Sequence, residues 1–94
     1  MRRQVWKFPL AATGVQLVHM PAGAQILSVQ LQGEGALSLW ALCEVDREPT
    51  ERAIAIYGTG HEMPSTEHGI LRFISTFQLD GGRLVFHAFE LVQS

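Results

Sequence analysis

The sequence predicts an all-β protein, folded as a single-domain antiparallel β-sandwich or a small barrel-like roll of about seven strands. Three observations support this fold class. Apolar and polar residues alternate with a period of two in several short runs. Glycine, proline and aspartate stand between these runs at positions typical of tight turns. A helical period fits residues 70–77 and 84–91 less well than a period of two.

The first half of the chain contains four of the expected strands, at residues 5–8, 15–20, 25–32 and 36–45. In the first strand Trp6 and Phe8 lie on one side, and Pro9 ends the strand or marks it as an edge. The third strand alternates over its whole length. Its expected apolar face consists of Leu27, Val29 and Leu31.

The second half contains three more expected strands, at residues 53–57, 70–79 and 83–92. Residues 44–52 are the most polar segment of the chain and are expected to form a solvated loop with weak local ion pairs. Asp80-Gly81-Gly82 is a strong tight-turn signal between the last two strands. The expected apolar face of the strand before this turn consists of Leu71, Phe73, Phe77 and Leu79.

Composition limits the classes of function. The chain has 94 residues, which predicts one domain, residues 1–94. A domain of this size buries only roughly 60–65% of its unfolded surface, and oligomerisation would relieve that narrow margin. The formal net charge is −2, so the sequence shows no electrostatic footprint for nucleic acid or for an anionic membrane. The expected partner is therefore a second copy of the chain.

The cellular compartment follows from cysteine usage and hydropathy. The chain has one cysteine, Cys43, so no internal disulfide is possible, which fits a reducing compartment. No run approaches the 18 or so apolar residues that a membrane-spanning helix needs. These observations predict a soluble, cytoplasmic protein.

Several segments together resemble a known family. Trp-Lys-Phe-Pro-Leu (residues 6–10), Met-Pro-Ala-Gly-Ala (20–24), Tyr-Gly-Thr-Gly-His (57–61) and Leu-Val-Phe-His (84–87) resemble, in order and spacing, short phage, prophage and bacterial proteins catalogued as a domain of unknown function. The resemblance extends over nearly the whole chain. It implies a phage or prophage context and a soluble cytoplasmic protein. It implies no activity, and no catalytic residue is assigned from it.

One stretch carries candidate binding residues: Tyr57, Gly58, Thr59, Gly60, His61 and Glu62. Two glycines let backbone N–H groups converge on an anion, the threonine adds a hydroxyl, and the histidine and glutamate form a possible base and partner. The stretch lacks the lysine and the following helix of a phosphate-binding loop. The structural alternative is that the glycines only turn the chain off the strand with positive φ. Both interpretations remain open.

The sequence predicts no metal site and no cofactor. A structural or catalytic metal site needs about three converging side chains, and His61 and His68 are the two histidines close enough in sequence to meet. His87, among apolar neighbours, is expected to be a hydrogen-bonded core residue. Cys43 alternates with apolar residues and is expected to be a small core side chain. Trp6 and Phe8, on a terminal strand, are the candidate interface residues.

Three functions remain. The first is a non-catalytic, homo-oligomeric binding or accessory module. The second is a protein that binds or sequesters a small, nucleotide-like anion with the loop from Gly58 to His61. The third is a small metal-dependent hydrolase that uses His61, Glu62 and His68. The sequence favours a non-catalytic role, and no residue is predicted to be catalytic.

Overall fold

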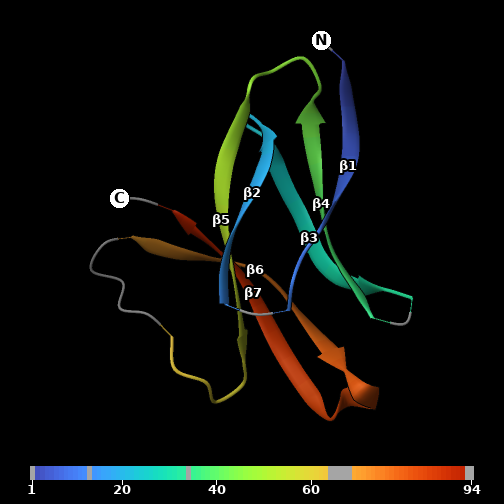
Figure 1. Cartoon of the computed structure of the whole chain (residues 1–94), viewed down its shortest axis with the longest axis vertical. Coiled ribbons are helices and arrows are strands. Elements are labelled where there is room, and N and C mark those ends of the chain that lie inside the picture. The colour runs from blue at the N-terminus through green and yellow to red at the C-terminus, as the bar shows by residue number, and fades with distance from the viewer. Residues whose placement is uncertain (1, 13, 34, 64–68, 93–94) are drawn as a thin grey trace.

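The computed structural model describes residues 2–12, 14–33, 35–63 and 69–92. These residues form seven strands and one short 3₁₀ turn, so the predicted all-β fold is confirmed (Figure 1). The elements are β1 (Arg3–Pro9), β2 (Gly14–Pro21), β3 (Gln25–Gln32), β4 (Ala36–Glu44), β5 (Pro49–Gly58), β6 (Ile70–Leu79), η1 (Asp80–Gly82) and β7 (Leu84–Val92). In this part of the chain no helix has the length and apolar character needed to cross a membrane.

The strands form two antiparallel sheets, and they do not close into a barrel. The first sheet has the order β1-β4-β3, and the second has the order β2-β5-β7-β6. The edge strand β3 of the first sheet lies beside the edge strand β6 of the second. The opposite edges, β1 and β2, are consecutive in the chain. The predicted sandwich is therefore present, joined along β3 and β6.

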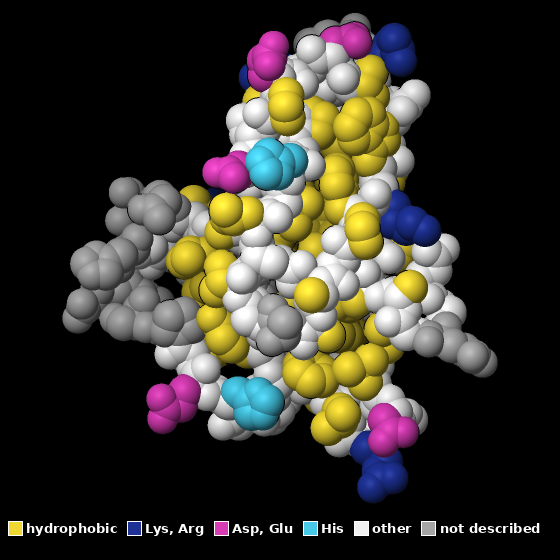
Figure 2. Space-filling view, in the orientation of Figure 1, with side chains coloured by type: hydrophobic (Ala, Val, Ile, Leu, Met, Phe, Trp, Pro, Cys, Tyr) yellow, Lys and Arg dark blue, Asp and Glu magenta, His cyan; other side chains and the backbone are white. Residues whose placement is uncertain are grey.

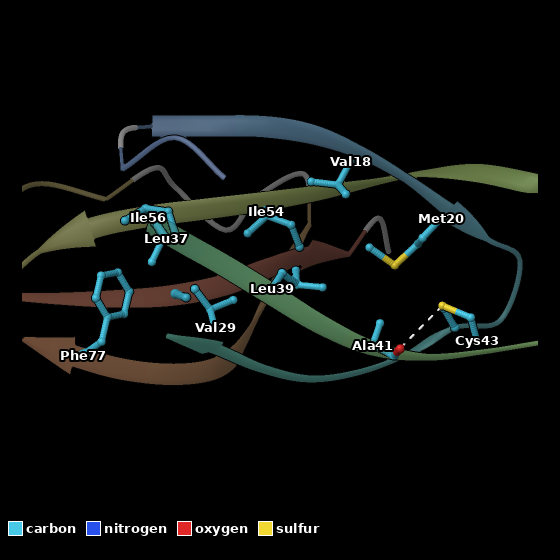
Figure 3. Close-up of a cluster of buried hydrophobic side chains, with 12 residues drawn as sticks. Val18, Met20, Val29, Leu37, Leu39, Ala41, Cys43, Ile54, Ile56 and Phe77 are labelled. Carbon is cyan, nitrogen blue, oxygen red and sulfur yellow. Dashed lines mark hydrogen bonds between the residues drawn. The ribbon is translucent and has the colours of Figure 1, made fainter. Parts of the chain in front are cut away.

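A single cluster of buried side chains fills the space between the sheets (Figure 3). Val29 and Leu39 come from the first sheet and Ile54 from the second, and all three are fully buried. Burying a side chain of this size stabilises the fold by roughly 1.5–3 kcal/mol. Cys43 belongs to the same cluster, as its alternation with apolar residues predicted. The alternation of Cys43 with Leu39 and Ala41 thus identified this part of the core correctly.

Two strands depart from the predicted alternation because each contains a β-bulge. In β3 the register shifts between Ile26 and Ser28, so Ile26 packs on the core whereas Leu27 is exposed. In β6 it shifts between Phe73 and Ser75. The prediction that Leu27 shares a face with Val29, and that Phe73 shares one with Phe77, is wrong. An extra residue in one strand moves every later side chain to the opposite face.

The loop within the polar segment 44–52 is shorter than predicted. β5 begins at Pro49, and Thr50, Glu51 and Arg52 pair with Met20, His19 and Val18 of β2. The predicted local ion pair is present, since Arg47 Nη1 lies 3.2 Å from Glu44 Oε2. The prediction that Arg52 is a solvated loop residue is wrong. Pairing with β2 gives the backbone groups of residues 49–52 their hydrogen-bond partners within the sheet.

Candidate functional site

The glycine-histidine stretch forms the turn that leaves β5. Tyr57 and Gly58 are its last strand residues, and the backbone N–H of His61 donates to the carbonyl of Gly58 at 3.1 Å. Gly60 has φ of +85°, a left-handed conformation that favours glycine. The structural role predicted for Gly60 is therefore present.

Gly58 has a different reason to be glycine. A Cβ atom at this position would lie 2.8 Å from both Nδ1 and Cε1 of His61, and 3.3 Å from Cε1 of Phe86. The imidazole ring of His61 therefore lies directly on the Gly58 backbone. A side chain at residue 58 would displace the ring. The sequence spacing thus places His61 beside the end of β5 even though the residue as a whole is exposed.

Thr59 connects this turn to β7 and, through His87, to β6. Its backbone N–H donates to Val85 O at 3.0 Å, and its hydroxyl donates to the same oxygen at 3.3 Å. Thr59 Oγ1 lies 2.7 Å from His87 Nε2, and Thr76 Oγ1 lies 3.0 Å from His87 Nδ1. A hydroxyl has one hydrogen, so Thr59 accepts from Nε2–H, and in the neutral imidazole Nδ1 then accepts from the Thr76 hydroxyl. The expectation that His87 is hydrogen-bonded is confirmed, although it lies on the sheet face away from the core cluster.

A cavity of about 220 Å³ lies beside this turn. Gly58, Thr59 and His61 line it, together with Arg83 from the hairpin that precedes β7. Tyr57 and Glu62, which the sequence grouped with them, do not line it. The Arg83 side chain is largely exposed. Its Nε atom lies 3.8 Å from Asp80 Oδ2, which is a long distance for an ion pair. The cavity is therefore lined by three residues that the sequence grouped together, and also by Arg83, a cation that the sequence did not connect to them.

A second and larger cavity, of about 310 Å³, was not anticipated from the sequence. It contains an ion pair in which Arg52 of β5 donates through Nε and Nη2 to the two carboxylate oxygens of Glu90 in β7. Arg52 also donates through Nη1 to the carbonyl oxygen of Ala24 at 2.9 Å. The carboxylate side chain is 8% exposed and the guanidinium side chain 21%. One signal was available: Glu90 interrupts an apolar strand, and a buried charge requires a partner.

The remaining candidates lie apart from both cavities. Trp6 and Phe8 pack against the core cluster and are half-buried, and the indole N–H of Trp6 donates to Gln4 Oε1 at 2.9 Å. His19 Nε2 lies 3.3 Å from Glu51 Oε2 in β5. His68 lies outside the described residues. Within the described ranges, no three His, Cys, Asp or Glu side chains are close enough together to hold a metal ion.

Comparison with known proteins gives one match. A family model described as a domain of unknown function (DUF7352) matches residues 1–94. This agrees with the resemblance to a domain of unknown function noted from the sequence segments. No curated protein and no solved structure matches the chain.

Proposed function

Because the chain belongs to the DUF7352 family of domains of unknown function, we propose from its own surface that it is a non-catalytic accessory module that works as a homo-oligomer. The resemblance to phage and prophage proteins supports placing this module in the cytoplasm of a phage-carrying bacterium. The observation that carries the proposal is the outer face of the sheet β2-β5-β7-β6, the face turned away from the core.

Two rows of apolar side chains cross all four strands of this sheet, and together they are called the apolar face here. The strand register aligns Val15, Ala55, Phe89 and Phe73 in one row. It aligns Leu17, Ala53, Leu91 and Leu71 in the next. Ala55 is fully buried yet lies outside the core cluster, which contains its neighbours Ile54 and Ile56. Its side chain therefore points to the apolar face.

Large side chains of the apolar face are open to solvent. Val15 is 51% exposed, and Leu17 and Phe73 are each 59% exposed. Half-buried Phe89 packs edge-on against Phe73, with ring centroids 5.8 Å apart. Contiguous exposed apolar surface of this kind marks an interaction site in a water-soluble protein. Hydrophobic side chains are also exposed over broad areas of the molecule in Figure 2, where the charged ones gather toward its ends and edges.

The charge on this face suits a second copy of the same chain. Among the described residues of the four strands, the charged group on the face is Glu51, which lies beside His19 at one end. The row at the other end is polar and contains Tyr57, His87 and Thr76. Two such faces can pack as a sandwich about 10 Å apart without opposing like charges across the apolar rows.

The surface area of the molecule also supports a second copy of the chain as the partner. The accessible surface is 6088 Å², whereas a compact monomer of 10.4 kDa has about 5,400 Å². The Cα radius of gyration is 13.6 Å, against about 12.4 Å for a compact chain of this length. The excess surface is close to the ~800 Å² that each partner buries in a standard stable interface. When two copies pack face to face, each can bury part of this excess surface.

A matched pair of substitutions tests this assembly. Val15→Glu places a charge on the apolar face, and Val5→Glu places the same charge at a similarly exposed valine in β1, the edge strand of the other sheet. We expect native mass spectrometry and light scattering to show an oligomer for the wild type and Val5→Glu, and a monomer for Val15→Glu. A monomeric wild type overturns the proposal. An oligomer lost only in Val5→Glu moves the interface to β1, next to Trp6 and Phe8.

A second candidate function is the binding of a small, nucleotide-like anion at the loop from Gly58 to His61. The cavity of about 220 Å³ favours it, because His61 and Arg83 both line this cavity and can donate to phosphate oxygens. A rise in melting temperature with cyclic or linear nucleotides is expected for the wild type and not for Arg83→Gln. An equal rise in both proteins would exclude this cavity as the site.

A further inference from the structure

The cavity of about 310 Å³ is built from both sheets. Ile26 and Leu27, at the β3 bulge, form one side. Arg72 and Phe73 of β6 form another, and the Arg52–Glu90 pair lies between β5 and β7. A volume near 300 Å³ is at the low end for small-molecule sites. The cavity can therefore hold a compact ligand and is too small for a dinucleotide.

The cavity has an unbalanced positive charge. Both carboxylate oxygens of Glu90 accept from Arg52, so this pair is neutral and fixed in place. Arg72 lies directly opposite Glu90 in the register of β6 and β7. In the described part of the chain, no side-chain hydrogen bond or ion pair involves Arg72, and the residue is exposed. One guanidinium is thus left to bind an incoming anion.

Apolar side chains stand next to this guanidinium. Ile74 of β6 and Ile26 of β3 line the cavity, and both are half-buried against the core cluster. Both bulges contribute to this arrangement, because they leave Ile26 and Ile74 on the core side, whereas Leu27 and Phe73 turn away from it. Two aliphatic side chains beside an arginine match a ligand that has an apolar body and one charged end.

We propose that this cavity binds a small molecule with a carboxylate or phosphate head and an apolar body. The planar guanidinium of Arg72 presents paired N–H donors that fit either head group. Ile26 and Ile74 line the cavity beside the body, and the Arg52–Glu90 pair keeps the inner wall rigid. The site is separate from the Gly58–His61 loop, and it lies on the core side of the sheet, opposite the apolar face.

Titration of the full-length, isotope-labelled protein followed by ¹H–¹⁵N NMR tests this proposal. The probes are benzoate and phenyl phosphate, with benzyl alcohol and inorganic phosphate as controls that each lack one half of the ligand. Saturable shifts of the Leu27, Arg72 and Phe73 amides are expected with benzoate, phenyl phosphate or both, and the tighter binder identifies the head group. Weaker shifts are expected with each control. Absence of saturable shifts with both probes overturns the proposal.

A matched pair of arginine variants locates the binding. Arg72→Gln should weaken the tighter probe at least tenfold, because it removes the free guanidinium at an exposed position without disturbing the core. Arg83→Gln, which makes the same change beside the smaller cavity, should leave the affinity unchanged. Weakening by Arg83→Gln alone would place the ligand at the Gly58–His61 loop, and equal affinity in both variants would exclude both arginines. Either result overturns the assignment to this cavity.

Discussion

The backbone N–H of Val29 in β3 donates to the hydroxyl oxygen of Ser75 in β6, at 2.8 Å and out of contact with solvent. The two residues come from different sheets, and each follows the bulge in its own strand. The hydroxyl therefore satisfies a buried donor where the edge strands β3 and β6 of the two sheets meet. This bond, together with the core, joins the halves of the sandwich.

Ser75→Ala should destabilise the protein by about 1–3 kcal/mol, because it leaves the buried Val29 N–H without an acceptor. The measurement is urea unfolding followed by tryptophan fluorescence, since Trp6 and Trp40 both lie in the first sheet. Ser38→Ala is the control. Ser38 is equally buried, but its hydroxyl makes a 3.5 Å local contact with Ala36 O. Equal losses for the two variants would show that the bond between the sheets contributes nothing of its own.

The two bulges also mark the limit of the sequence-based predictions, because strand positions were predicted and some strand faces were not. Each of the seven predicted strands overlaps a strand of the structure, and the bounds of β3 and β6 are those predicted. Alternation assigns faces only while the register is unbroken, so Leu27 and Phe73 were placed on the wrong faces. A bulge depends on what the neighbouring strand offers, here the Ser75 hydroxyl, and a single-strand pattern does not record this.

The candidate site was predictable to a similar extent. The glycines and Thr59 indicated a tied turn, and the structure places Gly58, Thr59 and His61 around one cavity. Arg83 is distant in sequence, and its approach depends on how β5 pairs with β7. The partner of Glu90 was equally hidden, because Arg52 lies in a segment whose composition is that of a loop. Local pattern predicts local structure, whereas these contacts depend on the order of strands in the sheet.

Loss of the Glu90 carboxylate should be costly. Glu90→Ala leaves the partly buried Arg52 guanidinium without its partner, a change that typically destabilises by about 3–5 kcal/mol. The expected reading is a matching fall in the free energy of unfolding measured with urea. Glu51→Ala, which removes the exposed partner of His19, should cost less than about 1 kcal/mol.

A double variant separates the pair from its surroundings. Replacing both members, as in Arg52→Met with Glu90→Leu, should recover much of the stability lost in Glu90→Ala, because no buried charge remains. If the double variant loses as much stability as Arg52→Met and Glu90→Leu lose together when measured singly, each residue acts alone, for example through the bond from Arg52 to Ala24.

Gly58→Ala should act through His61. The new methyl group would lie 2.8 Å from the imidazole, so the ring has to move off the turn. We expect a cost of about 1–3 kcal/mol, as for other overpacked sites, together with a large change in the NMR shifts of the His61 ring. In a His61→Ala background the same substitution should cost clearly less, because only the contact with Phe86 at 3.3 Å remains. An equal cost in both backgrounds would place the strain in the backbone and not in the ring.

Cys43 should make the protein less stable at alkaline pH. Its side chain is fully buried, and burial raises the pKa of the Cys43 thiol because the charged thiolate is disfavoured there. The unfolded chain therefore loses this proton at a lower pH than the folded chain does. The stability contributed by the neutral thiol is complete below the unfolded pKa and is lost as the pH rises through the folded pKa. The melting temperature should fall less steeply between pH 7 and pH 10 for Cys43→Ala than for the wild type. Iodoacetamide should alkylate the native thiol far more slowly than the thiol of the urea-unfolded chain. Parallel pH profiles would mean that the thiol has the same pKa in the folded and unfolded states, which contradicts the prediction.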